Sequence, residues 1–186
     1  MPTADWFVDD AHRLRPVARQ LPSPNCNERP DPQDISLVVV HAIALPPETF
    51  GGPHIDALFT NRLDPSLHPY FESIRELRVS SHLCIFRDGA CTQYVPFDRR
   101  AWHAGASVFE GRTNCNDFSV GIELEGSDTQ PFEDAQYDAL VRALRALLRR
   151  YPRLSRARVV GHADVAPGRK TDPGPFFDWS RLGAAL

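Results

Sequence analysis

The stretch that decides the fold reads ISLVVVH and spans residues 35–41. A short run this rich in β-branched residues predicts a buried β-strand. The next segment, residues 42–52, contains prolines and glycines, so the chain is expected to leave the sheet there as an irregular loop. His41 is therefore expected at the rim of the sheet, where its side chain faces a cleft.

A second strand is predicted over residues 118–125, which read FSVGIELE. Apolar and polar residues alternate, so one face of this strand belongs to the core and the other carries acidic groups. The core face holds Val120, Ile122 and Leu124, and the acidic face holds Glu123 and Glu125.

Hydrophobic spacing and turn residues predict the remaining elements. Apolar residues recur every three or four positions from residue 133 to 151, which predicts an amphipathic helix that ends before Pro152. The same signals predict two shorter helices, a hairpin around Asp88-Gly89 and a strand that leads into His162. These segments are residues 55–63 and 70–77 for the helices, 81–87 and 91–95 for the hairpin, and 158–161 for the strand.

The length and composition predict one domain, and the predicted strands and helices assign it to the α/β class, with α+β-like character. The chain has 186 residues, of which 42% are hydrophobic, and this is enough for a single well-filled core. The prolines at positions 16, 22, 24, 30 and 32 rule out a continuous helix near the N-terminus. We therefore expect residues 1–34 to form an arm packed on a domain that comprises residues 35–186.

Composition also argues against several classes of protein. No apolar run approaches the roughly 18 residues that span a bilayer, and the N-terminus lacks the basic and apolar segments of an export signal. The formal net charge of -3 argues against a nucleic-acid partner. The four cysteines, Cys26, Cys84, Cys91 and Cys115, include no C-x-x-C pair. They are expected to be reduced thiols of a cytoplasmic protein rather than metal ligands or a redox pair.

The stretch with the most candidate metal-binding and catalytic residues reads GHADVAPGRKTDPGP and spans residues 161–175. It places His162 and Asp172 in one loop, and His41 leaves a strand end that could be a neighbour. Two histidines and one carboxylate leave a fourth position open, as in catalytic zinc sites. Zinc lowers the pKa of a bound water from about 15.7 to about 7 and polarises carbonyl groups. We therefore expect zinc, held by His41, His162 and Asp172.

A site of this kind also needs a general base and a group that stabilises negative charge. Glu123 is the candidate base, because its strand fixes it and the alternation points it away from the core. Lys170, which lies between the two later ligands, is the candidate oxyanion partner. The structural alternatives are a solvated strand face for Glu123 and an ordinary surface position for Lys170.

Five ordered blocks of the chain resemble a known family. They read VVVHAIALPPETFGG, NRLDPSLHPYFESIRELRVSSHLCIFRDG, AWHAGAS, CNDFSVGIELEGSDT and GHADVAPGRKTDPGPFFDW. Together they resemble the zinc-dependent type 2 amidases of the peptidoglycan-recognition superfamily, and among these the cytoplasmic N-acetyl-anhydromuramyl-L-alanine amidases. The similarity begins near residue 21 and covers most of the chain.

The resemblance implies a mixed β-sheet flanked by helices, with zinc in a groove on one face. It also implies that His41, His162 and Asp172 bind zinc, that Glu123 accepts a proton and that Lys170 stabilises the transition state. The implied reaction is hydrolysis of the amide between anhydro-N-acetylmuramic acid and the L-alanine of the stem peptide. The implied substrate is a soluble anhydromuropeptide of cell-wall recycling, and we expect a monomer with no nucleic-acid or membrane partner.

Three further positions are interpreted through the same resemblance. An arginine that matches Arg78 meets a peptide carboxylate in relatives, and Trp102 is similar to a residue of the saccharide wall. The structural alternatives are a surface ion pair for Arg78 and core packing for Trp102. Members of the family commonly carry Asn after the first ligand, so Ala42 predicts the loss of one polar contact.

The remaining histidines are interpreted more conservatively. His82 and His103 are expected to border the groove in hydrogen-bonded structural roles rather than as ligands, and His12, His54 and His68 are assigned no chemistry. Two other functions stay open: a muropeptide-binding protein without catalysis, and an amidase that acts on intact peptidoglycan.

Overall fold

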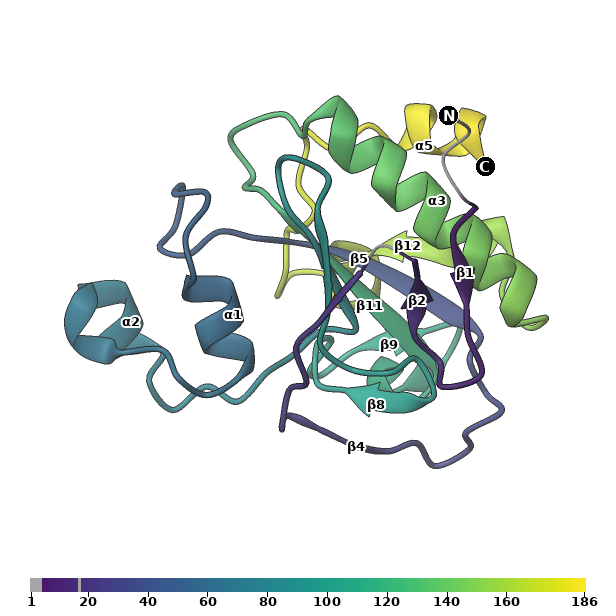
Figure 1. Cartoon of the computed structure of the whole chain (residues 1–186), viewed down its shortest axis with the longest axis horizontal. Coiled ribbons are helices and arrows are strands. Elements are labelled where there is room, and N and C mark those ends of the chain that lie inside the picture. The colour runs from purple at the N-terminus through teal and green to yellow at the C-terminus, as the bar shows by residue number, and fades with distance from the viewer. Residues whose placement is uncertain (1–4, 17) are drawn as a thin grey trace.

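A six-stranded mixed β-sheet forms the centre of the computed structural model, which describes residues 5–16 and 18–186 (Figure 1). The strand order is β12-β5-β11-β6-β7-β3. The bounds are Val159–Gly161 for β12, Leu37–Ile43 for β5, Ser119–Glu125 for β11, Leu83–Ile85 for β6, Cys91–Gln93 for β7 and Arg19–Gln20 for β3. The first four strands are parallel, β7 is antiparallel to β6, and β3 is parallel to β7. The predicted α/β class with a central mixed sheet is confirmed.

The two long central strands, β5 and β11, set the geometry of the site. Their parallel register places Glu123 beside His41, so both side chains project from the same face of the sheet. Every residue of β11 is buried, because parallel strands at the centre of a sheet are covered on both faces. The alternative of a solvated strand face for Glu123 is therefore wrong, since this residue is only 8% exposed.

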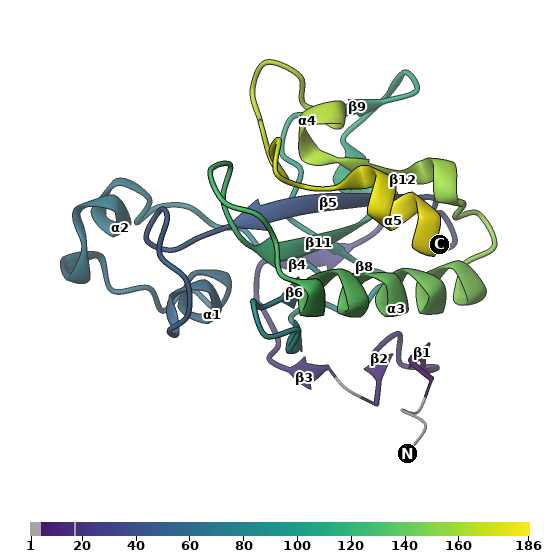
Figure 2. The same cartoon turned by 90° about the horizontal axis from the view of Figure 1, so that it is seen from above.

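Helix α3 (Asp134–Arg150) covers the opposite face of the sheet (Figure 2). Its N-terminus is capped by the side chain of Gln136, which accepts a hydrogen bond from the backbone N–H of Glu133 at 3.0 Å. Its apolar side joins the sheet in one buried cluster, which includes Leu140, Leu144 and Leu147 of the helix and Val38, Val40, Val120, Ile122 and Leu124 of the strands. Helix α5 (Trp179–Ala185) contributes Leu182 to the same cluster. The alternation predicted for residues 118–125 is confirmed on this face.

The face that carries His41 and Glu123 is covered by irregular segments. Residues 102–118 cross it together with the short helix α4 (His162–Val165), and Ala104, Cys115 and Val165 pack there against the sheet. The segment after residue 161, expected as a loop, thus begins with one helical turn. The small strands of this half are β8 (Arg99–Ala101), β9 (Val108–Phe109) and β10 (Arg112–Thr113).

The N-terminal segment packs on the domain without forming a helix in its described residues. It contains β1 (Phe7–Val8), β2 (Leu14–Arg15), β3 and β4 (Cys26–Glu28). Strand β3 extends the central sheet, and β4 pairs with β8. Leu14 is fully buried in the α3-side cluster, so this segment contributes to the core as well as covering it.

Helices α1 (His54–Phe59) and α2 (Pro69–Ser73) project from one end of the sheet (Figures 1 and 2). Both are shorter than the predicted spans of 55–63 and 70–77. Helix α1 ends early because Asn61 has a positive φ of 58°, which lies outside the helical region. The 3-10 helices are η1 (Pro65–Leu67), η2 (Cys115–Asp117) and η3 (Arg156–Arg158). Among the described residues, no helix has the length and apolar character required to cross a membrane.

Candidate metal centre

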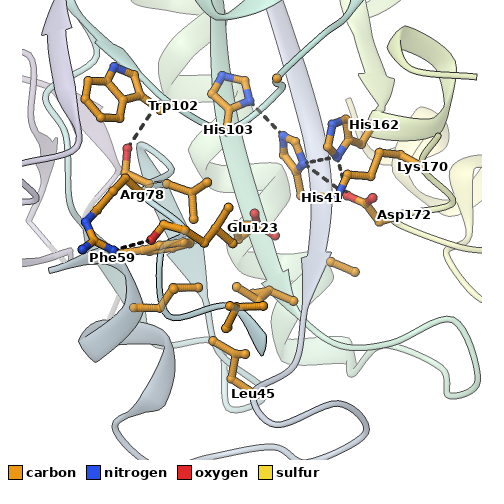
Figure 3. A pocket seen from close by; sticks show the side chains of 18 of the residues that line it. His41, Leu45, Phe59, Arg78, Trp102, His103, Glu123, His162, Lys170 and Asp172 are labelled. Carbon is orange, nitrogen blue, oxygen red and sulfur yellow. Dashed lines mark hydrogen bonds and ion pairs between the residues drawn. The ribbon is translucent and has the colours of Figure 1, made fainter. Parts of the chain in front are cut away.

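Three side chains from separate segments meet at one end of the sheet. His41 lies near the end of β5, and His162 is the first residue of α4, directly after β12. Because β12 is the parallel neighbour of β5, the two histidines leave the sheet on the same edge. Asp172 follows ten residues later, and its backbone oxygen accepts a hydrogen bond from the N–H of Ala163 at 2.9 Å. Figure 3 shows all three side chains directed toward one point.

The donor atoms of this triad have the spacing of a tetrahedral metal site. The Nδ1 atoms of His41 and His162 are 2.9 Å apart, and Asp172 Oδ2 lies 3.2 Å from the first and 3.0 Å from the second. Ligands that bind zinc at about 2.0 Å in tetrahedral geometry lie about 3.3 Å from one another. These three residues could therefore hold a divalent metal ion.

The protonation of His162 also fits a metal. Its Nε2 lies 3.2 Å from the backbone oxygen of Ala104, which can only accept a hydrogen bond. Nε2 therefore carries a proton, and Nδ1 is the nitrogen that faces His41 and Asp172 and can bind a metal. A carboxylate and an unprotonated imidazole nitrogen at this distance repel each other unless a cation lies among them. The backbone contact to the outer nitrogen is the usual support of a metal-binding histidine.

Burial and neighbouring groups shift the pKa values of His41 and Asp172 in directions that favour metal binding. Burial lowers the pKa of His41 to about 4, although its contact with the Asp172 carboxylate opposes this, so the ring is neutral at pH 7. Burial acts to raise the pKa of Asp172, but its contacts with His162 and His41 outweigh this and hold that pKa below its ordinary value. A neutral imidazole and an ionised carboxylate are the forms that bind metals.

Glu123 lies on the same face as the triad and has an unsatisfied oxygen. Its Oε2 is buried and has no hydrogen-bond partner among the described residues. Burial raises the pKa of Glu123 well above its ordinary value, the charge of Asp172 raises it further, and the charge of Lys170 lowers it. A buried carboxyl group without a partner is uncommon in structural positions, and it resembles the acids and bases of active sites.

Lys170 is the only lysine in the chain, and all the other long basic side chains are arginines. It is exposed and lies beside Asp172 at the rim of the groove (Figure 3). Its neighbour Arg169 donates hydrogen bonds to the backbone oxygens of Ala104 at 2.5 Å and Ala106 at 2.7 Å. These bonds join the loop that carries Lys170 and Asp172 to the segment of residues 102–118.

The triad opens into a groove with a volume of about 460 Å³. One wall is apolar and comes from the α1–α2 end of the molecule, with Leu45, Phe59, Tyr70, Ile74 and Leu77. Arg78 lies exposed on this wall. Its guanidinium donates only to the backbone oxygens of Arg75 and Leu77, and no carboxylate of the described residues pairs with it. The alternative of a surface ion pair for Arg78 is therefore wrong.

Trp102 lines the groove close to Arg78, and its backbone oxygen accepts a hydrogen bond from the N–H of Ser80 at 3.1 Å (Figure 3). Its ring is partly exposed, and its Nε1 donates to Asn27 Oδ1 at 2.6 Å. It therefore lines the groove rather than filling the core. Ala42 also lines the groove and packs at the same time against the cluster beneath α3.

The other histidines fall into two groups. His103 lines the groove and contacts His41, with 2.9 Å between His103 Nδ1 and His41 Nε2. His82 is fully buried, donates to the backbone oxygen of Arg99 and accepts from the N–H of Gly121. His12, His54 and His68 lie away from the triad. His12 bonds to Tyr151, His54 packs on Phe71 and His68 caps α2.

Sequence reasoning did not find three residues that lie beside the site, namely Ser119, which contacts His103, Gly121 and Arg169. Gly121 gave a usable signal, because a glycine inside a strand pattern indicates close approach by another group. A Cβ at this position would overlap with the ring of His103. Ser119 and Arg169 act through backbone oxygens brought together by the fold, so no residue spacing could reveal them.

Comparison with known proteins gives a consistent set of matches. A family model described as N-acetylmuramoyl-L-alanine amidase matches residues 31–175. The 1,6-anhydro-N-acetylmuramyl-L-alanine amidase AmpD of Citrobacter freundii is 58% identical over 169 residues, which make up 91% of this chain and 90% of the relative.

Two solved structures are also similar. A crystal structure of a selenomethionine derivative of AmpD has a TM-score of 0.92 at 55% identity, and the match covers 95% of this chain and 98% of that chain. The amidase AmiD from E. coli was solved in complex with its substrate anhydro-N-acetylmuramic acid-L-Ala-D-gamma-Glu-L-Lys. Its TM-score is 0.60 at 32% identity, covering 82% of this chain and 57% of that chain.

Proposed function

The chain belongs to the N-acetylmuramoyl-L-alanine amidase family, and we propose that it hydrolyses the amide that joins anhydro-N-acetylmuramic acid to L-alanine in soluble muropeptides. The observation that carries this proposal is the convergence of His41 Nδ1, His162 Nδ1 and Asp172 Oδ2 within 3.2 Å of one another at the floor of a groove. The relatives named AmpD are amidases of the anhydro substrate, and AmiD binds such a substrate in its crystal structure. The proposed setting is cell-wall recycling in the cytoplasm by a monomer.

The proposed cofactor is zinc, held by His41, His162 and Asp172 in the amidase domain of residues 35–186, with residues 1–34 as a packed arm. Two imidazoles and one carboxylate form a donor set that suits zinc and leaves one position open. Bound there, zinc supplies a Lewis acid that polarises the scissile carbonyl and lowers the pKa of water.

Glu123 is the proposed proton carrier. Its unpartnered Oε2 accepts a proton from the attacking water, and its raised pKa makes the carboxylate a stronger base than an exposed glutamate. When the bond between the carbonyl carbon and the L-alanine nitrogen breaks, the same carboxyl group donates this proton to the nitrogen. The oxygen of the water thus becomes part of the new carboxylate, and the proton carried by Glu123 goes to the released amine.

Lys170 is proposed to stabilise the negative charge that develops on the carbonyl oxygen. Its ammonium group is the only one at the groove, and its charge already affects the pKa values of Glu123 and His41. Arg78 and Trp102, which both line the groove, are proposed to bind the substrate. Arg78 has a guanidinium free to pair with a peptide carboxylate, and Trp102 offers a partly exposed ring to a sugar.

The activity is tested by incubating the zinc-loaded chain with anhydro-N-acetylmuramyl tripeptide and following release of the peptide by mass spectrometry. We expect one cleavage, loss of activity with a chelator and recovery with zinc. Binding of the fragment without cleavage by a zinc-loaded sample would contradict the proposal and favour a muropeptide-binding protein. Equal or faster cleavage of intact sacculi would contradict the proposed substrate.

The role of Lys170 can be tested chemically because the chain contains one lysine. Reductive methylation keeps the positive charge, whereas acetylation removes it. We expect acetylation to lower kcat by about 100-fold or more, the usual effect of losing one group that stabilises an oxyanion, and methylation to lower it far less. Lys170→Arg, which neither reagent modifies at position 170, controls for reaction at the α-amino group. Full activity of the acetylated chain would exclude this role.

A further inference from the structure

His41 is connected to the interior of the protein by a chain of hydrogen bonds that the proposed reaction does not use. His41 Nε2 lies 2.9 Å from His103 Nδ1, and His103 Nε2 lies 3.2 Å from Ser119 Oγ. Ser119 Oγ in turn lies 2.6 Å from the backbone oxygen of Cys115. Figure 3 shows the first of these contacts, on the side of His41 away from Asp172.

The donors and acceptors in this series of hydrogen bonds are fixed at its inner end, at Ser119. The oxygen of Cys115 is a carbonyl and can only accept, so the hydroxyl proton of Ser119 must point toward it. Ser119 Oγ can then offer only a lone pair to His103, whose Nε2 must carry a proton. His103 Nδ1 is left with a lone pair, because among the described residues no carboxylate contacts this ring to hold it in the doubly protonated form.

The same reasoning determines the state of His41. Its Nε2 faces the lone pair of His103 Nδ1 and must therefore carry the proton. Its Nδ1 is left unprotonated and faces His162 Nδ1 and Asp172 Oδ2. His162 reaches the same tautomer through one direct hydrogen bond to the oxygen of Ala104.

We propose that His103 and Ser119 are positioning residues that fix the Nε2–H tautomer of His41, so that its Nδ1 is ready to bind the metal before the metal arrives. Two residues of β11 support this arrangement on the face of the sheet that carries His41. Ser119 begins the strand and ends the hydrogen-bond chain, and Gly121 leaves the space that the ring of His103 occupies. Asn116 holds the segment in place, because its Oδ1 accepts from the backbone N–H groups of His103 and Ala104.

The proposal rests on the metal site of the proposed function, but its first test needs neither metal nor activity. Long-range ¹H–¹⁵N correlation spectra of the metal-free chain, recorded above the ordinary histidine pKa of about 6.5, report the tautomer of each imidazole. We expect His41 and His103 to carry their protons on Nε2. A proton on Nδ1 of His41 in the metal-free chain would overturn the proposal, whether or not the chain is an amidase.

The second test measures zinc affinity by competition with a chromophoric chelator. We expect His103→Leu and Ser119→Ala to weaken zinc binding by about 10- to 100-fold, the range typical of lost support to a metal-binding histidine. His103→Asn keeps an acceptor for His41 Nε2 and should recover most of the affinity. The matched control is Ser81→Ala, which removes a buried hydroxyl that bonds only to the backbone oxygen of Leu83. Equal zinc affinity of Ser119→Ala and Ser81→Ala would contradict the proposal. If Ser119→Ala does not fold, the long-range ¹H–¹⁵N spectrum of His103→Asn takes its place. A proton on Nε2 of His41 in that variant supports the proposal, and a proton on Nδ1 contradicts it.

Discussion

At the scale of single residues, the site is characterised by pKa shifts of carboxyl groups that are usually exposed and are buried here. Glu123 is a carboxyl group on a central strand, and its pKa is raised because water is excluded and Asp172 is close. Asp172 is also shielded from water, but two histidines hold its pKa low. Two carboxyl groups on one groove thus receive opposite pKa shifts, which is the pattern expected of one base and one metal ligand.

Substitution of Glu123 separates proton transfer from metal binding. Glu123→Gln keeps the size and polarity of the side chain but removes the base, so we expect kcat to fall by about 10²- to 10⁴-fold. Zinc content should stay at the wild-type level, because Glu123 does not belong to the triad. Glu76→Gln, at an exposed glutamate, is the matched control. Wild-type turnover in Glu123→Gln would exclude Glu123 as the base.

At the scale of elements, the long or strongly patterned segments could be predicted from sequence. The strand that reaches His41, the alternating strand at 119–125 and the helix at 134–150 follow from residue patterns. The first strand continues to Ile43, so the prediction that the irregular loop begins at Ala42 was wrong by two residues. The short helices α1 and α2 were predicted too long, since their ends depend on single residues such as Asn61. The turn that makes His162 the start of α4 has no pattern of its own, because four residues are too few to show one.

The pairing of elements could be predicted less well than the elements themselves. Sequence suggested that His41 and His162 leave neighbouring strand ends, and the parallel pairing of β12 with β5 agrees with this. Sequence could not show that β3 from the N-terminal segment joins the sheet beside β7. Residues 19 and 20 are polar, and a two-residue edge strand depends on its partner rather than on its own pattern.

His82 links several elements and makes stability depend on pH. Its ring connects β11 to the first residue of β8, and burial lowers its pKa to about 3. The unfolded chain takes up a proton on this histidine near pH 6.5, while the folded chain does not. His82 therefore contributes stability above about pH 6.5, and this contribution is lost as the pH falls, at about 1.4 kcal/mol per pH unit.

The measurement is urea unfolding of the metal-free chain at a series of pH values from 7 downward. His82→Asn retains an acceptor for the N–H of Gly121 and cannot titrate, so we expect a shallower loss of stability with acid than in the wild type. His68→Asn, at an exposed histidine that caps α2, should follow the wild-type curve. Parallel curves for His82→Asn and wild type would show that His82 is not the source of the effect.

At the scale of the whole molecule, Arg29 ties the N-terminal segment to the half that carries the site. Its guanidinium is 4% exposed and donates hydrogen bonds to the backbone oxygens of Phe97, Asn116, Asp117 and Ser119. Burial lowers its pKa to about 10, so the charge is kept at pH 7. One arginine therefore satisfies carbonyl groups at the start of β11 and in the segment that holds His103.

Loss of Arg29 should destabilise the whole chain. Arg29→Met leaves these buried carbonyl groups without donors, and we expect the free energy of unfolding to fall by about 3 kcal/mol or more. Arg75→Met removes an exposed arginine that pairs with Glu72 on the surface and should cost less than about 0.5 kcal/mol. The check is the urea midpoint of each variant, and equal midpoints would contradict a structural role of the N-terminal segment.

The proposed function depends on His41, His162 and Asp172 holding one zinc ion and leaving a position open for water. X-ray absorption at the zinc edge of the zinc-loaded chain tests this coordination. We expect one zinc per chain, surrounded only by nitrogen and oxygen at about 2.0–2.1 Å, and loss of that zinc in Asp172→Ala but not in Asp138→Ala, an exposed residue of α3. A sulfur shell near 2.3 Å, or full zinc content in Asp172→Ala, would contradict it.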